Sequence, residues 1–285
     1  MIKRSHFIKT ISLATLAMPL GAYTLRNQST MKIGLVTYQW GKDWDLATII
    51  NNCEKSKVLG VELRTEHKHG VEPGLNTQQR ADVKKRFQNS PVKLVGYGSN
   101  AEFDSADVVV LQKNISLAKD LLQLSHDVGG SGVKVKPNKF HDGIPHQQTL
   151  EQIGRSLNEL GKFAENLGQK VRLEVHGEGT QELINIKAIM DVAVHPHVVV
   201  CWNCNPTDLN GNGFEYNFNL VKDRLGDTIH IHEINGNYPN KDLARLLNKK
   251  KFTGWLLLEC TSEPADKVKA MTEQREAWEA MIMTA

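Results

Sequence analysis

The fold of this chain can be inferred from residues 228–260, TIHIHEINGNYPNKDLARLLNKKKFTGWLLLEC. The two ends of this stretch, 228–234 and 254–260, are short apolar runs of the kind that forms buried strands. Residues 240–249, between them, have the spacing of an amphipathic helix. A strand, a helix and a second strand in this order predict a right-handed βαβ unit with parallel strands.

The same alternation recurs along the chain after residue 31. Further strands are expected at 32–38, 60–64, 92–98, 132–137, 171–176 and 198–203, and further helices at 44–57, 76–89, 107–127, 147–168, 181–191, 216–224 and 263–283. Eight such units in about 250 residues are typical of a closed (β/α)8 barrel. The first strand is not followed by GxGxxG and the sequence has no GxxxxGK[ST], so a doubly wound nucleotide-binding fold is disfavoured. We therefore expect one α/β domain, a TIM barrel, over residues 31–285.

The first thirty residues differ from the rest of the chain. MIKRSHFIKT is basic, ISLATLAMPLGAY is apolar, and a polar segment follows. This order predicts a signal peptide over residues 1–30 and export, which favours the periplasm. The apolar part is short for a stable membrane span. A disordered leader or a single anchor helix remains the alternative.

Composition narrows the class of partner. The 285 residues carry a formal net charge of +3 and no long run of Lys or Arg, so we expect no nucleic-acid partner. The spacing of Cys201 and Cys204 matches a redox pair or half of a zinc site. Cys201 ends a β-branched run and the chain has no second CxxC, so both interpretations are disfavoured. A small-molecule partner is the better expectation.

Polar residues lie at the carboxyl ends of four consecutive expected strands, where TIM barrels place their active sites. They are Glu174, Asn203, His232 and Glu259. Two carboxylates and an imidazole that point into one cavity are costly to desolvate unless a cation neutralises them. Oxygen and nitrogen ligands of this kind suit Mn, Mg, Co or Zn. The sequence therefore predicts a divalent metal site.

LEVHGE, CWNCNP, IHIHEIN and WLLLEC, in this order, resemble the xylose isomerase-like superfamily of sugar phosphate isomerases and epimerases. The superfamily also includes ketose 3-epimerases, inosose dehydratase and endonuclease IV. The resemblance covers nearly all of residues 31–285 and implies metal ligands at Glu174, His232 and Glu259. The chain departs from the family pattern at Asn203 and Pro206, where the family has Asp and His. A neutral amide binds a cation less tightly than a carboxylate does.

The resemblance also implies a reaction. In the sugar epimerases of this family the two metal-bound glutamates move the proton, which makes Glu174 and Glu259 the expected catalytic residues. A cation stabilises the enediolate while a carboxylate takes the proton beside the carbonyl. We expect an isomerase or epimerase of carbohydrate metabolism. If the substrate has a leaving group at the β-carbon, the same site gives a dehydratase or lyase.

Other polar residues near the expected strand ends are candidates for contacts with a sugar or polyol substrate. They are Glu62, Arg64, His67, Lys136, His176 and His230. The sequence leaves a homo-oligomer open. Two alternatives remain: a phosphodiesterase of the endonuclease IV type, which needs a richer set of metal ligands, and a non-catalytic carbohydrate-binding barrel, which Asn203 allows. Two buried carboxylates favour the enzyme.

Overall fold

The structure, a computed structural model that describes residues 31–284, contains a closed barrel of eight parallel strands. Each strand pairs with the next in the chain, and β8 pairs with β1. The strands are β1 (Lys32–Val36), β2 (Gly60–Arg64), β3 (Lys93–Glu102), β4 (Gly132–Lys136), β5 (Lys170–Glu174), β6 (Val198–Asn203), β7 (Leu225–Ile231) and β8 (Trp255–Leu258). The predicted (β/α)8 TIM barrel is confirmed.

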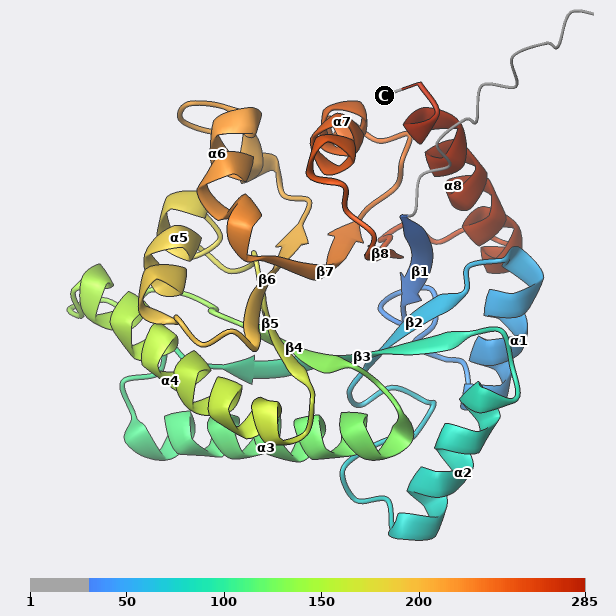
Figure 1. Cartoon of the computed structure of the whole chain (residues 1–285), viewed down its shortest axis with the longest axis horizontal. Coiled ribbons are helices and arrows are strands. Elements are labelled where there is room, and N and C mark those ends of the chain that lie inside the picture. The colour runs from blue at the N-terminus through green and yellow to red at the C-terminus, as the bar shows by residue number, and fades with distance from the viewer. Residues whose placement is uncertain (1–30, 285) are drawn as a thin grey trace, which may run out of the picture.

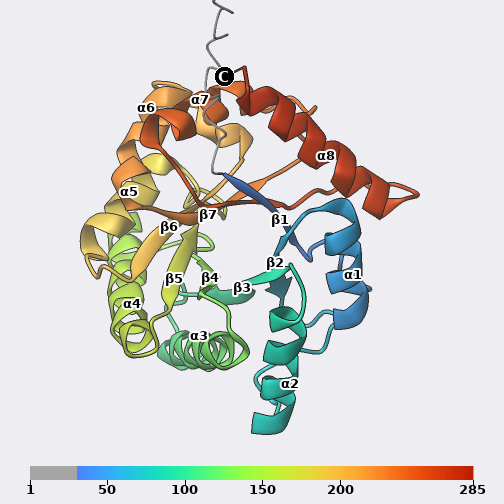
Figure 2. The same ribbon diagram turned by 45° about the vertical axis from the view of Figure 1, so that its right-hand side comes forward.

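Helices connect the strands and surround the barrel (Figure 1). They are α1 (Leu46–Ser56), α2 (Thr77–Gln88), α3 (Val108–Val128), α4 (His146–Asn166), α5 (Leu183–Val192), α6 (Phe214–Val221), α7 (Asn240–Lys250) and α8 (Lys267–Ile282). Figure 2 shows them following one another around the strands in chain order. No helix in residues 31–284 combines the length and the apolar character that a membrane crossing needs.

Local signals fix several helix ends. The side chain of Asp45 accepts a hydrogen bond from the Thr48 amide and so caps α1. Asn76 and Gln79 form a reciprocal capping box at the start of α2. Gly129 ends α3 in the left-handed conformation, which glycine adopts without a steric penalty. The first two caps set where α1 and α2 begin, and the third sets where α3 ends.

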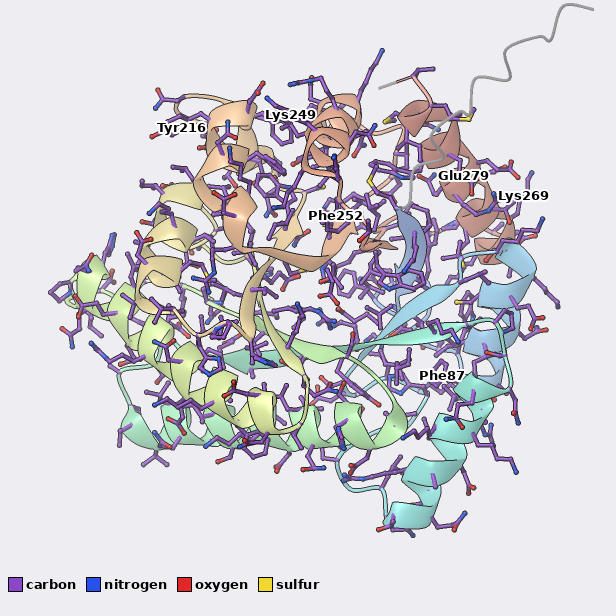
Figure 3. All side chains as sticks on the ribbon, viewed as in Figure 1. Phe87, Tyr216, Lys249, Phe252, Lys269 and Glu279 are labelled. Carbon is purple, nitrogen blue, oxygen red and sulfur yellow. The ribbon has the colours of Figure 1, made fainter. Side chains whose placement is uncertain are left out.

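Two regions of buried side chains hold the barrel together. The larger one lies between the strands and the helices, and it includes the buried side chains of Phe87 and Phe252, which Figure 3 labels. Lys269 and Glu279 on α8, labelled in the same figure, are exposed. Inside the barrel, only a small apolar cluster centred on Val36, Val95 and Leu257 is present among residues 31–284. Charged side chains occupy much of the remaining interior.

The predicted element ranges need a few corrections. β3 continues to Glu102, four residues beyond its expected end. β7 ends at Ile231, so residues 232–234 follow the strand and do not belong to it. The expected helix at 216–224 divides into α6 and a 3-10 turn, Lys222–Arg224, and another 3-10 turn, Pro206–Leu209, follows β6. The predicted leader at 1–30 lies outside the described residues.

Candidate active site

His230 lies at the centre of the carboxyl-terminal half of the barrel. β7 carries it, and its side chain is fully buried. Its Nδ1 lies 3.0 Å from Oε1 of Glu174 and 3.2 Å from Oε2 of Glu259. Its Nε2 lies 3.2 Å from Oε1 of Glu62, an ion-pair distance without the alignment of a hydrogen bond. One imidazole therefore contacts three carboxylates from three different strands or strand ends.

Glu174, the last residue of β5, is paired on its other side. Its Oε2 accepts a hydrogen bond of 2.8 Å from Nζ of Lys134 on β4. Both side chains are almost completely buried, at 0% exposure for Lys134 and 1% for Glu174. Glu174 is therefore fixed between an ammonium group and an imidazole.

Glu259 directly follows β8 and is less enclosed. Its Oε1 lies 3.8 Å from Nη1 of Arg64, the last residue of β2. The guanidinium of Arg64 also lies over the ring of Tyr38, 5.2 Å from its centroid. Because these side chains come from β8, β2 and the segment after β1, the site spans the seam where the barrel closes.

The charges of the site compensate one another. Burial acts to lower the pKa of His230, but Cys201, Glu62 and Glu259 around it raise the pKa well above its ordinary value. Burial acts to raise the pKa of Glu174, whereas Lys134 and then His230 bring it well below the usual range. His230 likewise lowers the pKa of Glu259 against the effect of burial. Protonated His230, Lys134 and Arg64 thus balance three carboxylates.

The donor set fits a divalent cation. Ligand atoms of Glu174, His230 and Glu259 lie within 4.8 Å of one another. Asn203, the last residue of β6, has its Nδ2 3.5 Å from Oε1 of Glu174, and its buried Oδ1 has no hydrogen-bond partner. Carboxylate, amide and imidazole groups are suitable ligands for Mn, Mg, Co or Zn. His230 binds a cation only when it is neutral, so binding and protonation exclude each other.

The histidine in this group differs from the predicted one. We predicted His232 as the metal ligand, but His230 occupies that position and His232 lies outside the group of three. The reason is that β7 ends at Ile231, so His232 follows the strand. Its Nδ1 lies 3.1 Å from the backbone oxygen of Glu259, and its side chain is half-buried. The structure therefore brings His230, and not His232, together with the two carboxylates, and the metal role of either histidine stays a prediction.

The predicted substrate contacts divide into deep and outer residues. Glu62 belongs to β2, as the expected strand at 60–64 requires, and is fully buried against His230. Arg64 and Lys136 lie nearer the solvent, at the ends of β2 and β4, and both donate to Oδ1 of Asn100. The structure thus brings Glu62 next to His230, while their contacts with a substrate stay a prediction.

His67 and His176 lie at the edge of the site. Nδ1 of His67 lies 3.3 Å from the hydroxyl of Thr37. Nδ1 of His176 is buried and has no hydrogen-bond partner. Burial lowers the pKa of both histidines, so they favour the neutral form. A neutral imidazole with a free nitrogen can donate to or accept from a sugar hydroxyl.

Sequence reasoning gave no role to Lys134 and did not consider Asn100. Lys134 shares a strand face with Lys136, and alternation along β4 was the signal that places it inside the barrel. No sequence pattern pointed to Asn100 as a residue of the site, because the extension of β3 to Glu102 was not predicted. All four cysteines are buried and free, so the CxxC spacing forms no disulfide here.

Comparisons with known proteins agree with this architecture. A search of curated proteins gives no match to the sequence. An L-ribulose 3-epimerase structure is 13% identical with a TM-score of 0.76, covering 89% of this chain and 95% of that one. The 3-keto-D-glucoside 4-epimerase YcjR from E. coli is 14% identical with a TM-score of 0.73, over 88% and 99% of the two chains. The IOLI protein with a bound zinc atom is 15% identical with a TM-score of 0.74, over 88% and 98%.

At these identities the structures show a shared fold. The family model described as xylose isomerase-like TIM barrel matches residues 50–281, which is most of the chain. That range begins in α1 and ends in α8, so it includes seven of the eight strands and every residue of the group around His230. This chain belongs to the xylose isomerase-like TIM barrel family.

Proposed function

We propose that this protein is a divalent-metal-dependent sugar isomerase or epimerase, which removes a proton next to a carbonyl and returns it through an enediolate. The observation that carries the proposal is the pair of buried carboxylates at His230. Glu174 and Glu259 approach its Nδ1 to 3.0 and 3.2 Å from different strands. Two carboxylates in one site allow a proton to be removed by one and returned by the other.

Glu174, Asn203, His230 and Glu259 are the residues that would hold the metal. When bound, a divalent cation supplies the positive charge that stabilises an enediolate oxygen. The lowered pKa values of Glu174 and Glu259 keep both carboxylates ionised at neutral pH and therefore able to accept a proton. Asn203 contributes no charge, so the cation would keep more of its polarising power than with a third carboxylate ligand.

The two carboxylates have different roles in this proposal. The ammonium of Lys134 lowers the pKa of Glu174 strongly, which makes Glu174 the weaker base. Glu259 has no ammonium partner at hydrogen-bond distance; its carboxyl contacts the imidazole of His230 at 3.2 Å and the guanidinium of Arg64 at 3.8 Å. We therefore assign the first proton removal to Glu259. The return of a proton on the other side of the substrate is assigned to Glu174, which passes on a proton of the Lys134 ammonium that is hydrogen-bonded to it.

The substrate class and the location are also proposals. Two structural neighbours are described as epimerases of L-ribulose and of a 3-keto-D-glucoside, which supports a sugar or polyol substrate here. The basic and apolar composition of residues 1–30 supports export to the periplasm. An exported enzyme meets free sugars and glycosides more than sugar phosphates.

Two other functions are outcomes of the test. A substrate with a leaving group at the β-carbon would undergo elimination through the same enediolate, which makes the enzyme a lyase. A carbohydrate-binding barrel without a metal is consistent with one observation: Lys134, Arg64 and protonated His230 already neutralise the three carboxylates. Metal content and exchange of substrate protons separate these functions.

The test is incorporation of solvent deuterium into ketoses and keto-glycosides by Mn²⁺-loaded protein, followed by mass spectrometry and NMR. We expect exchange by the wild type and a loss of about 10²-fold or more for Glu259→Gln, since a positioned general base contributes about 10²–10⁴-fold. Glu263→Gln is the matched control, because Glu263 is exposed and lies four residues further along the chain. It should exchange like the wild type.

Each other outcome has a distinct meaning. Loss of a β-substituent together with exchange identifies a lyase. Stoichiometric sugar binding without metal and without exchange identifies a binding protein. Unchanged exchange in Glu259→Gln would contradict the role of Glu259 as the base.

A further inference from the structure

Two cationic side chains converge on one neutral atom beside the carboxylate pair. Nη2 of Arg64 lies 3.1 Å from Oδ1 of Asn100, and Nζ of Lys136 lies 3.0 Å from the same oxygen. Arg64 ends β2 and Lys136 ends β4, and Asn100 lies on β3 between them. A single amide oxygen therefore separates two positive charges that repel each other.

Neither cation is fully neutralised by the protein. Lys136 forms no ion pair within 4.0 Å in the described part of the chain, although Glu102 is its partner in the β3–β4 register. Nη1 of Arg64 is 3.8 Å from Glu259, and its buried Nε has no acceptor. Burial, Lys134 and Arg64 lower the pKa of Lys136. Glu174 and Glu102 act to raise it. Arg64 and Lys136 nevertheless share one neutral acceptor, the Asn100 amide oxygen.

We propose that Arg64 and Lys136 bind the carboxylate of an acidic sugar, so that the substrate is a uronate-type keto acid and not a neutral ketose. The inference rests on the proposed function and specifies its substrate class. A carboxylate has two oxygens, so it can accept from the guanidinium and from the ammonium at once, in charge-assisted hydrogen bonds. Asn100 is exposed, and its amide oxygen provides only a dipole at the place where the carboxylate would lie.

The position of the two cations suits such a substrate. Through its two terminal nitrogens, Arg64 reaches both Asn100 and Glu259, so it joins the anion site to the carboxylate that removes the proton. Exposure to solvent increases from the carboxylates toward the anion site. The side chain of Glu174 is 1% exposed, that of Arg64 is 13% exposed, and Asn100 is exposed. The charged end of the substrate would therefore lie toward the solvent and its carbonyl end toward His230.

The experiment compares matched acidic and neutral sugars. Isothermal titration of Mn²⁺-loaded protein would use D-fructuronate and D-tagaturonate beside D-fructose and D-tagatose, with D-fructose 6-phosphate as a second kind of anion. Deuterium exchange would be measured on the same samples. The variant is Lys136→Met, and the control is Lys139→Met, which removes an exposed lysine from the following loop. Thermal unfolding would check that both variants fold.

We expect the uronates to bind at least about tenfold more tightly than the neutral ketoses, in line with the strength of a hydrogen bond between charged groups. Lys136→Met should remove most of this preference, because it weakens binding of the uronates more than binding of D-fructose and D-tagatose. Lys139→Met should keep the preference. A stronger preference for D-fructose 6-phosphate would assign the site to a phosphate and overturn the carboxylate.

The two proposals fail in different ways. Equal binding and equal exchange of acidic and neutral sugars would overturn the anion site and leave the enzyme in place. Uronate binding that depends on Lys136 but gives no exchange would overturn the proposed reaction and leave the anion site in place. Two further results would overturn the anion site. One is that no uronate binds at 10 mM, whether or not D-fructose binds. The other is a preference for uronates that Lys136→Met does not remove.

Discussion

The two ends of the barrel both bury charge, but they satisfy it differently. At the amino-terminal end, fully buried Arg172 donates to both oxygens of Asp227, at 2.9 and 3.0 Å, to the hydroxyl of Ser131 and to the backbone of Val95. At the carboxyl-terminal end, several buried polar atoms have no hydrogen-bond partner: both oxygens of Glu62, Nδ1 of His176, Oδ1 of Asn203 and Nε2 of His230.

This difference distinguishes buried charges that stabilise the fold from buried polar groups that can bind a ligand. A buried charge with all its hydrogen bonds made stabilises one conformation and has no capacity left for a ligand. Buried polar atoms without partners cost free energy unless something else binds them. The amino-terminal pair is therefore a structural element, whereas the carboxyl-terminal group keeps buried polar atoms that could bind the metal and the substrate of the proposed function.

The largest expected effect comes from breaking the structural pair. Arg172→Met leaves the carboxylate of Asp227 without its partner, and removal of one member of a buried pair costs about 3–5 kcal/mol. We expect about 3 kcal/mol, because the side chain of Asp227 is 34% exposed and water can solvate part of the charge. Urea denaturation would measure the loss, and metal binding by the remaining folded protein should be unchanged.

Arg155→Met is the control for that variant. The pair of Arg155 with Glu151 is exposed and lies within α4, so its loss should change the free energy of unfolding by less than about 0.5 kcal/mol. If Arg172→Met abolished metal binding without loss of stability, the division between the two ends of the barrel would be wrong.

The sequence was sufficient for the barrel because strand and helix periods differ and repeat eight times. It was also sufficient to place Glu174 and Glu259, since each lies at or just after the end of a strand that alternation places. It did not show which of His230 and His232, on one face of the predicted strand, lies beside these carboxylates. That choice depends on the strand ending at Ile231, and a strand end is set by contacts with neighbouring strands.

The sequence also did not show which charged side chains pair across the barrel. Lys134 is forty residues from Glu174, and only the register of β4 against β5 brings them together. The same is true of Arg64 and Lys136, which meet through Asn100 on an extended β3. Such contacts depend on the register between neighbouring strands, which cannot be deduced from a single sequence.

A smaller effect is expected from the unpartnered amide of the site. Asn203→Ala removes Oδ1 and should weaken Mn²⁺ binding by about tenfold or more, whereas Asn203→Asp adds a charged ligand and should tighten it by a similar factor. Direct titration and elemental analysis would measure both. Asn210→Asp adds the same charge at an exposed position seven residues away and should have little effect. Equal affinities in all four proteins would exclude Asn203 as a ligand.

The smallest effect concerns a buried carboxylate that has only neutral donors. Asp208 accepts from the hydroxyl of Tyr238 at 2.6 Å and from the Asn205 amide at 3.0 Å. Glu174 has the ammonium of Lys134 as a partner, and the pKa of its carboxyl is lowered. Asp208 has no cationic partner, and burial raises the pKa of its carboxyl to about 7. Burial acts to raise the pKa of both carboxyls, and the charge of the partner decides the net direction of the shift.

The raised pKa of Asp208 predicts how stability changes with pH. Below the unfolded pKa near 4 the carboxyl is neutral in both states, and its contribution is fully present. That contribution is lost as the pH rises through about 7, because ionisation then favours the unfolded chain. Each pH unit between the two pKa values is worth about 1.4 kcal/mol, so from pH 5 to 8 the group should lose at least about 1 kcal/mol.

Asp208→Asn keeps the shape and removes the titration, so the free energy of unfolding of the wild type relative to this variant should fall between pH 5 and 8. Tyr238→Phe removes a hydrogen bond that lowers the pKa of Asp208, and should make the fall steeper. Urea denaturation at several pH values measures the difference. A wild type that gained stability relative to Asp208→Asn as the pH rose would mean that a cation reaches Asp208, and the contrast with Glu174 would then disappear.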